Sequence, residues 1–378
     1  MNRSKSRGRV ISLFLFLAFC LLLVGAISWI FLLRPSDDRA GYPGAVSGEF
    51  PARDFERDFH EAEIIVHLTE PITPADPAEP VTAFFPMFPL EYALVAIPAD
   101  PWDMLQFPVD RWRDSRFEVF SWDRFPEILV FDISTFGMQD RLFKRLAFFV
   151  EKAGFRGRLS HDEEIADLHG WNAHNYQASD LAVFFNLARS TGFPLLDEEW
   201  ELESILLRNG VLALDPAGNL VAGRGAVLSL TQERSHFGLR PRFMAHEVFH
   251  GLFFIDADFR EFSRQRWEAF PEFGRTFFLA FLRLQEYDIG YEFLVINEFM
   301  GHLLQLPVAQ NSWFFGQHIS NRLFREGLAH ALPERYEMRE GIRFWPDLAS
   351  LFTAETEVFS RYVYERWGLA AGRAWRLR

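Results

Sequence analysis

Apolar and polar residues change their pattern near the middle of this chain. In the first half, short apolar runs predict strands at residues 63–68, 92–97 and 127–134. Residues 138–154 carry Leu142 and Leu146 at helical spacing and stop at Gly154, so they predict an amphipathic helix. With the segment FRGRLS that follows, this strand and helix predict a β-α-β unit.

The second half is predicted to be mainly helical. Helical patterns cover residues 179–192 and 197–210, and a hairpin-like stretch follows at 211–232 with its turn at Pro-Ala-Gly-Asn. Helix signals then continue to the C-terminus. We therefore expect an α+β protein, with an α/β N-terminal domain at residues 50–195 and a mainly helical domain at residues 196–378.

The first 33 residues predict a membrane anchor. Residues 1–9 carry four basic side chains, and residues 10–33 contain no charged residue across 24 positions. As a helix this run is about 36 Å long, enough to cross a bilayer, and the basic tail favours a cytoplasmic N-terminus. A cleaved signal peptide ending near Ala26 is the alternative, but the apolar run continues past that point. Residues 34–49 are expected to tether the span to an extracytoplasmic body.

Composition narrows the function. With 49% hydrophobic residues in 378, the chain has material for a substantial core. The net charge of -13 and the lack of a basic, aromatic-rich segment exclude an electrostatic surface for nucleic acid. Cys20 is the only cysteine and lies in the predicted span, so the exported part has neither disulfides nor thiol chemistry.

The segment RFMAHEVFHGLFF, residues 242–254, contains the candidate chemistry. Helical spacing places His246 and His250 one turn apart on one face, where both imidazoles can reach a single ion. Glu247 lies about 100° further round the helix, in reach of a water rather than of the ion. Two nitrogen ligands and a carboxylate that accepts a proton are what metal-assisted hydrolysis requires.

The alternative interpretation is a buried helix that happens to carry polar residues. The motif lies among apolar residues on nearly every side, as a buried helix would. Three ionisable side chains on such a helix cost several kcal/mol unless they are paired or bind a metal. The surroundings therefore favour a metal site, with Zn²⁺ as the expected ion.

A catalytic zinc site uses three protein ligands, and two carboxylates compete for the third place. Asp256 lies ten residues after His246, but the pattern that uses this position needs a glycine where Phe253 stands. Glu298 lies on a second predicted helix of mainly apolar residues. Glu298 is the favoured third ligand, and Asp256 is the alternative.

At this point the chain resembles a known family. INEFMGH, residues 296–302, is similar to the N-E-x-x-S-D segment of the gluzincins, the thermolysin-like zinc peptidases. The resemblance implies a zincin-like catalytic domain, zinc ligands at His246, His250 and Glu298, and Glu247 as general base. His302 stands where the family has an aspartate that orients a ligand. The resemblance also implies a peptide substrate that pairs with an edge strand at residues 225–232.

Weaker candidates surround this motif. The polar segment 169–180 is expected to be a substrate-recognition loop using His174, Asn175 and Tyr176. Further candidates lie downstream, where a side chain could bind substrate or stabilise an oxyanion. They are His318 and Arg322, followed by His302, Tyr291 and His330. Asp132 ends a predicted strand, where ligand sites occur in α/β sheets, but a structural role is favoured.

These patterns together predict a membrane-anchored zinc metallohydrolase, with a peptidase favoured and a peptide or protein as substrate. A catalytically inactive scaffold protein of the same fold is the first alternative. Iron held by two histidines and a carboxylate is the second.

Overall fold

The computed structural model describes residues 89–170, 172–233 and 238–376, all within one compact unit that comprises Glu63–Arg378. The predicted basic tail, membrane span and tether at residues 1–49, and the predicted strand at 63–68, lie outside the described residues. Among the described residues, no helix combines the length and the apolar character needed to cross a bilayer.

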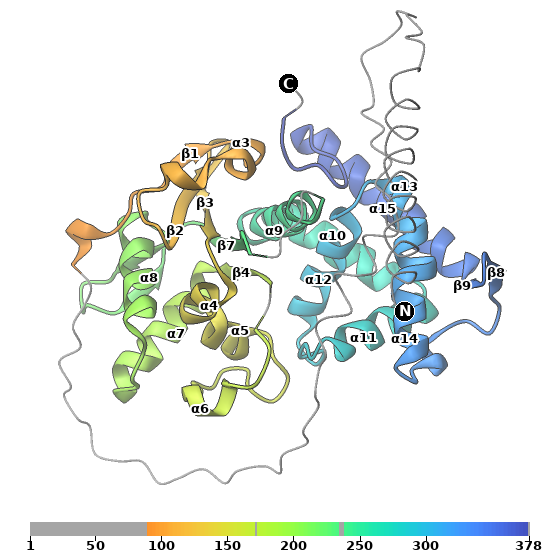
Figure 1. The fold of residues 1–378 in the computed structure, drawn as a ribbon, viewed down its shortest axis with the longest axis horizontal. Coiled ribbons are helices and arrows are strands. Elements are labelled where there is room, and N and C mark those ends of the chain that lie inside the picture. Colours follow the sequence, from red (N-terminus) through yellow and green to blue (C-terminus); the bar gives the residue numbers. More distant parts are fainter. Residues whose placement is uncertain (1–88, 171, 234–237, 377–378) are drawn as a thin grey trace, which may run out of the picture. The chain divides into compact units, whose positions relative to one another are not determined.

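A mixed five-stranded sheet forms the centre of the first half (Figure 1). Its strands, in spatial order, are β1 (Ile97–Ala99), β2 (Phe117–Trp122), β3 (Phe125–Ile133), β7 (Ala226–Thr231) and β4 (Ala173–Gln177). β1 pairs with β2 and β3 pairs with β7 in parallel, whereas β2 with β3 and β7 with β4 are antiparallel. The strand predicted at 127–134 is confirmed as part of β3.

The position of β7 corrects two expectations. β7 lies between β3 and β4, so the segment 225–232 is an interior strand and β4 forms that edge of the sheet. Its approach to β3 is close, because a Cβ on Gly225 would lie 1.8 Å from the Glu127 carbonyl oxygen. The predicted boundary at residue 195 also fails to separate two compact bodies, since β7 comes from the second half and completes the sheet of the first.

Helices cover both faces of the sheet, and alternate residues of each strand point to opposite faces. On one face Leu129 and Phe131 pack against α4 (Phe136–Gln139), the π-helical segment η3 (Asp140–Lys144), α5 (Arg145–Val150), α7 (Ala178–Thr191) and α8 (Asp197–Arg208). On the other face Ile128 and Val130 pack against α9 (Leu239–Ile255). The helices predicted at 138–154, 179–192 and 197–210 are thereby confirmed, the first with a π-helical turn in its middle.

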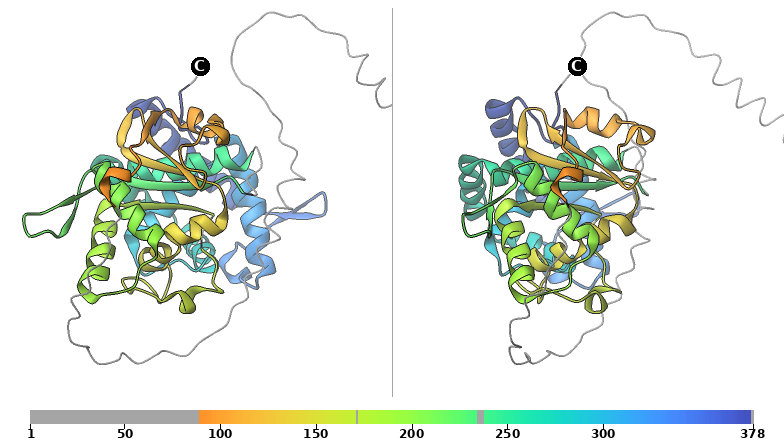
Figure 2. Two further views of the ribbon diagram at one scale, coloured as in Figure 1. Left: turned by 60° about the vertical axis from the view of Figure 1, so that its left-hand side comes forward. Right: turned by 90° about the vertical axis from the view of Figure 1, so that its left-hand side faces the viewer.

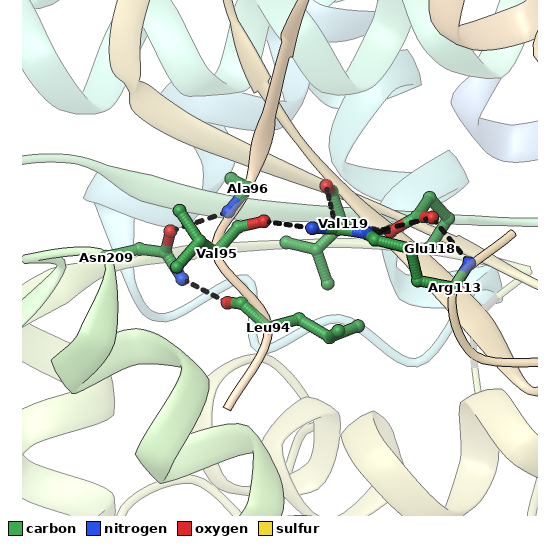
Figure 3. Close-up of polar contacts among 7 residues, drawn as sticks. All are labelled: Leu94, Val95, Ala96, Arg113, Glu118, Val119 and Asn209. Atoms are coloured by element: carbon green, nitrogen blue, oxygen red, sulfur yellow. Dashed lines mark hydrogen bonds and ion pairs between the residues drawn. The ribbon is translucent and has the colours of Figure 1, made fainter. Parts of the chain in front are cut away.

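Two predicted strands are absent. FRGRLS forms turns, with Gly157 at a φ of 75°, so the crossover from β3 leads to β7. Residues 93–96 are extended but have no neighbouring strand. Asn209 accepts from the Ala96 amide and donates to the Leu94 carbonyl, and Arg113 donates to the Val95 carbonyl (Figure 3). Side chains thus make the hydrogen bonds to this backbone that a neighbouring strand would otherwise make.

The residues after α9 are mainly helical, as predicted, and lie on the far side of α9 from the sheet (Figure 1). Their longer helices are α10 (Ala257–Ala269), α11 (Glu272–Leu284), α12 (Glu292–Leu304) and α15 (Pro346–Trp367). α13 (Val308–Trp313), the π-helical segment η4 (Phe314–Ile319) and α14 (Ser320–Arg325) form one continuous helical stretch. Whether this part is zincin-like stays a prediction.

Short elements complete the described chain. They are η1 (Leu90–Tyr92), α3 (Pro101–Gln106), η2 (Val109–Arg111), α6 (Asp162–Ile165) and η5 (Ala329–Ala331). The predicted hairpin is confirmed as β5 (Leu212–Leu214) and β6 (Leu220–Ala222), and a second one is formed by β8 (Glu337–Arg339) and β9 (Ile342–Phe344). Both hairpins extend away from the body (Figure 2).

A buried ion pair ties the sheet to the start of α9. Asp132, near the end of β3, accepts from both terminal nitrogens of Arg240 at 3.0 and 2.9 Å and from Gln232 at 2.7 Å. Burial raises the pKa of Asp132, and the Arg240 guanidinium offsets part of that rise. Asp132 is therefore structural, as the sequence favoured, and it fixes the direction in which α9 leaves the sheet.

Candidate metal centre

The candidate site lies between two packed helices, α9 and α12. α9 buries Met244, Val248 and Leu252 in the core beneath the sheet. His246 and His250, one turn apart, occupy its other face. Glu298 faces them from the middle of α12, which is apolar on nearly every side. Both helices are held by their apolar residues, and the polar cluster lies where they meet.

The distances suit a shared ion. Glu298 carboxylate oxygens lie 3.6 Å from His246 Nε2 and 3.7 Å from His250 Nε2. The two Nε2 atoms are 2.9 Å apart. Zinc–ligand bonds of about 2.0–2.1 Å in a tetrahedron place neighbouring ligand atoms about 3.3 Å apart. These three side chains therefore need only small movements to bind one ion.

Burial keeps both imidazoles neutral. His250 is 0% and His246 8% exposed. Burial lowers the pKa of His246 to about 3, with a further contribution from the Arg242 guanidinium. Burial likewise lowers the pKa of His250 to about 4. At neutral pH both rings thus carry a lone pair, the state in which imidazole binds a metal.

Glu298 fits a ligand rather than a packing role. It is 0% exposed, and neither carboxylate oxygen has a hydrogen-bond partner among the described residues. Burial raises its pKa, and the His250 ring and the nearby Tyr287 side chain offset part of the rise. A buried carboxylate without such partners is costly, and a cation between it and the imidazoles would remove that cost.

Asn297 orients one of the ligands. Its side-chain oxygen Oδ1 lies 2.8 Å from His250 Nδ1. An amide oxygen only accepts hydrogen bonds, so His250 carries its proton on Nδ1 and presents the Nε2 lone pair to Glu298 and His246. Such a partner for the distal ring nitrogen is usual for metal-binding histidines.

His302 places a third imidazole beside the ligand group. One ring nitrogen each from His246 and His302 lies within 4.8 Å of a Glu298 oxygen. His302 Nδ1 is 2.9 Å from the Glu298 carbonyl oxygen, to which it donates. The proton on Nδ1 leaves the lone pair of His302 on Nε2, as in His250, so His302 is a further candidate ligand. Either His250 or His302 can therefore join His246 and Glu298 as the third ligand, which leaves one position open.

Glu247 lies next to this group but outside it. It is 3% exposed and accepts a hydrogen bond of 3.2 Å at Oε2 from Asn175 on β4. Burial raises its pKa well above the usual value, and the nearby Glu298 carboxylate raises it further. A carboxyl with a raised pKa holds a proton more readily, as a general base must after it takes one.

Asp256 is not the third ligand. Its side chain caps α10 by accepting from the Phe259 amide at 2.8 Å. It also pairs with Arg366 at 2.7 Å. Both oxygens therefore have partners at the other end of α9, whereas Glu298 faces the imidazoles.

The predicted substrate residues His174 and Tyr176 point away from the site. The polar segment is not a loop here but contains β4, so adjacent side chains face opposite ways. His174 Nδ1 bonds the Tyr176 hydroxyl at 2.8 Å, and its ring stacks on Phe143 on the far face of the sheet. Asn175, between them, faces Glu247.

The two downstream substrate-binding candidates differ in how close they lie to the ligand group. His318 stacks on Phe314, whose ring in turn stacks on His302, so His318 lies one ring removed from the ligand group. The π-helical segment η4 carries both Phe314 and His318, and such segments are frequent at functional sites. For Arg322 the structure gives Glu326 and Arg325 as charged neighbours, not the ligand group.

Tyr291 and His330 do not join the site either. Arg156 lies 3.5 Å over the ring of Tyr291, which is half-buried outside the ligand group. His330 is exposed.

Sequence reasoning missed Asn175 as a partner of Glu247, Asn297 as the partner of His250, and Tyr287 near Glu298. Asn297 directly precedes the ligand Glu298, and that adjacency was a usable signal. Asn175 was predicted only as a substrate-recognition residue, and nothing local marks Tyr287, because each reaches the site from a separate element.

Gly301 allows the two helices to come together. A Cβ at this position would lie 2.7 Å from His250 Cε1 and Nε2 and 3.0 Å from His246 Cε1. We expect Gly301→Ala to weaken zinc binding about 10- to 100-fold by displacing both rings, the range seen when ligand-orienting residues are lost. Competition with a zinc chelator of known affinity measures this change.

Gly251→Ala is the matched control. Apart from its chain neighbours, the three atoms nearest to its Cβ would all belong to Ile128, at 3.0 to 3.4 Å. This variant should lower the free energy of unfolding by about 1–3 kcal/mol through overpacking while zinc affinity stays the same. Equal zinc affinities in both variants and the parent protein would show that Gly301 does not support the site.

Comparison with known proteins adds no relative, because no family model, curated protein or solved structure matches this chain.

Proposed function

We propose that this protein is a zinc-dependent peptidase. The observation that carries the proposal is the buried group of His246, His250 and Glu298, in which two neutral imidazoles face a carboxylate without hydrogen-bond partners among the described residues. Glu247 adjoins this group and remains outside it. Three ligands, an open position and a separate carboxylate are the requirements for hydrolysis at zinc.

In the proposed reaction the ion and Glu247 have separate roles. Zinc, when bound, supplies a Lewis acid that acidifies water and polarises a substrate carbonyl. Glu247 accepts the proton of the attacking water and passes it to the leaving nitrogen. Its burial and the adjacent Glu298 raise its pKa, which favours holding the proton between those two steps.

The edge of the sheet supports a peptide as substrate. The Ala178 amide donates to Gly225, which places the backbone groups of residues 174 and 176 toward β7 and those of Ala173, Asn175 and Gln177 outward. Among the turn, loop and cap hydrogen bonds of the described residues, none uses the outward groups of Ala173 or Asn175, whereas the Gln177 carbonyl lies at the start of α7. An extended peptide can add to such an edge by main-chain hydrogen bonds. The side chain of Asn175 contacts Glu247, so that peptide would lie beside the proposed base.

The N-terminal residues support a location for this activity. The basic tail and the uncharged run 10–33 favour a single-pass anchor with a cytoplasmic N-terminus, which would place the peptidase outside the cytoplasm.

The first test is zinc dependence. Purified full-length protein should contain about one zinc per chain, since the site offers one set of ligands. Removal of zinc with 1,10-phenanthroline should abolish cleavage of a mixed peptide library, and one equivalent of zinc should restore it. Cleavage is followed by mass spectrometry. A folded protein with far less than one zinc per chain and no zinc-dependent cleavage would instead indicate a scaffold protein.

A further inference from the structure

A chain of buried amide side chains joins the proposed base to a proposed ligand. Asn175 Nδ2 donates to Glu247 Oε2 at 3.2 Å, and Asn297 Nδ2 donates to Asn175 Oδ1 at 3.3 Å. His250 Nδ1 donates to Asn297 Oδ1 at 2.8 Å. All four side chains are buried. The chain crosses from α9 through α12 to β4 and returns to α9.

Every bond in this chain runs in one direction. His250 must donate because Asn297 Oδ1 only accepts, and this leaves the Asn297 amide nitrogen for Asn175 Oδ1. The amide nitrogen of Asn175 then has the Glu247 carboxylate as acceptor. With Glu247 ionised, reversal of one or both amides would place oxygen against oxygen, so in that state both side chains are fixed in orientation.

The hydrogen bond from Asn175 to Glu247 acts directly on the proposed base. A hydrogen bond to an ionised carboxylate is roughly twice as strong as one between neutral groups. Asn175 takes one Glu247 oxygen, Oε2, and this leaves Oε1 to accept a proton from water. The side chain of Glu247 is thereby held in one rotamer, and a base displaced by about 1 Å can lose a factor of 10² in rate.

Asn175 also belongs to the strand at which a peptide would bind. Its side chain faces α9, while its backbone amide and carbonyl point out of the free edge of β4. One residue therefore contacts the proposed base and presents hydrogen-bonding groups to a paired peptide.

We propose that Asn175 is a positioning residue that holds Glu247 for proton transfer and ties the base to the strand that binds the substrate. This inference rests on the proposed peptidase function. A purely structural role for Asn175, to satisfy a buried carboxylate, would predict a loss of stability without a selective loss of turnover.

Asn175→Leu tests this difference because it keeps the approximate size, removes the donor and adds no charge beside Glu247. In the zinc-loaded full-length protein we expect kcat to fall about 10- to 100-fold while KM changes less than about threefold. Zinc content should not change. In a Glu247→Gln background the same substitution should have no further effect on the residual rate, because the base is already lost.

Tyr176→Phe is the matched control on the same strand. The Tyr176 hydroxyl bonds His174 on the opposite face of the sheet, so its removal should leave kcat unchanged. An Asn175→Leu protein that retains kcat, or that loses activity equally in both backgrounds, would overturn the positioning role. These outcomes leave the peptidase proposal standing, since the parent protein is active in the same assay.

A second readout does not need activity. In selectively ¹⁵N-asparagine-labelled protein, the side-chain amide signals of Asn175 and Asn297 should be protected from solvent exchange. Glu247→Ala should shift the Asn175 signal strongly, because the charge-assisted bond is lost. Rapid exchange of the Asn175 amide, or no shift on Glu247→Ala, would overturn the proposal even for a protein that cleaves no peptide.

Discussion

Replacement of Glu247 by glutamine should reduce kcat for peptide cleavage about a thousandfold while zinc remains bound. Glutamine keeps the size of the side chain and can still accept from Asn175, but its amide cannot take a proton from water. Zinc should remain because His246, His250 and Glu298 are unchanged. Initial rates and metal analysis on the same preparation measure both quantities.

This substitution should also preserve the fold. Burial raises the pKa of Glu247, which means that its ionised form is costly in the folded protein, and a neutral amide removes that cost. Thermal unfolding of the variant should therefore occur at the same temperature as in the parent protein or above it. A Glu247→Gln protein that cleaves peptides at the parent rate, free of contaminating protease, would exclude Glu247 as the base.

The second large effect should come from Glu298→Gln, which we expect to weaken zinc binding by more than about a hundredfold. That exceeds the loss typical of residues that only orient a ligand, since here a coordinating oxygen is removed. Zinc in thousandfold excess over its dissociation constant stabilises a protein by about 4 kcal/mol, and most of this stabilisation should disappear in the variant. Chelator competition and thermal unfolding with and without zinc give both values.

Asp256→Asn is the matched control, because it removes the same charge from the other carboxylate that the sequence offered as a ligand. Asparagine keeps the α10 cap, since its side-chain oxygen can still accept from the Phe259 amide, and loss of the partly exposed Arg366 ion pair should cost less than about 1 kcal/mol of stability. Zinc affinity should stay at the parent level. The opposite result, with zinc lost in Asp256→Asn and retained in Glu298→Gln, would mean that the ligand set is assigned incorrectly.

His302 separates this site from the family that the sequence resembles. In the gluzincins an aspartate at this place orients a ligand histidine. Here an imidazole packs edge-to-face on His246, with ring centroids 4.8 Å apart, and donates to its own helix. Burial lowers its pKa well below the usual value, so it is neutral and brings no negative charge to the ligands. The resemblance from which the ligands and the base were predicted therefore does not include this partner.

The sequence by itself determined the elements and contacts that depend on near neighbours. The helices over α7, α8, α9 and α12 follow from apolar residues at helical spacing. The approach of His246 to His250 follows from the same 3.6-residue period. The choice of Glu298 over Asp256 came from a short resemblance and stays a prediction, although Asp256 is engaged by Arg366 while Glu298 faces the imidazoles.

Only the tertiary structure decided which distant segments meet. It placed β7 inside the sheet and β4 at its edge, and it turned Asn175 toward Glu247 while His174 faced the opposite core. It also replaced the strand predicted at 92–97 by a segment held by Asn209 and Arg113, more than a dozen residues away. Strand order and side-chain partners of this kind depend on packing between elements, and local periodicity contains no information about that packing.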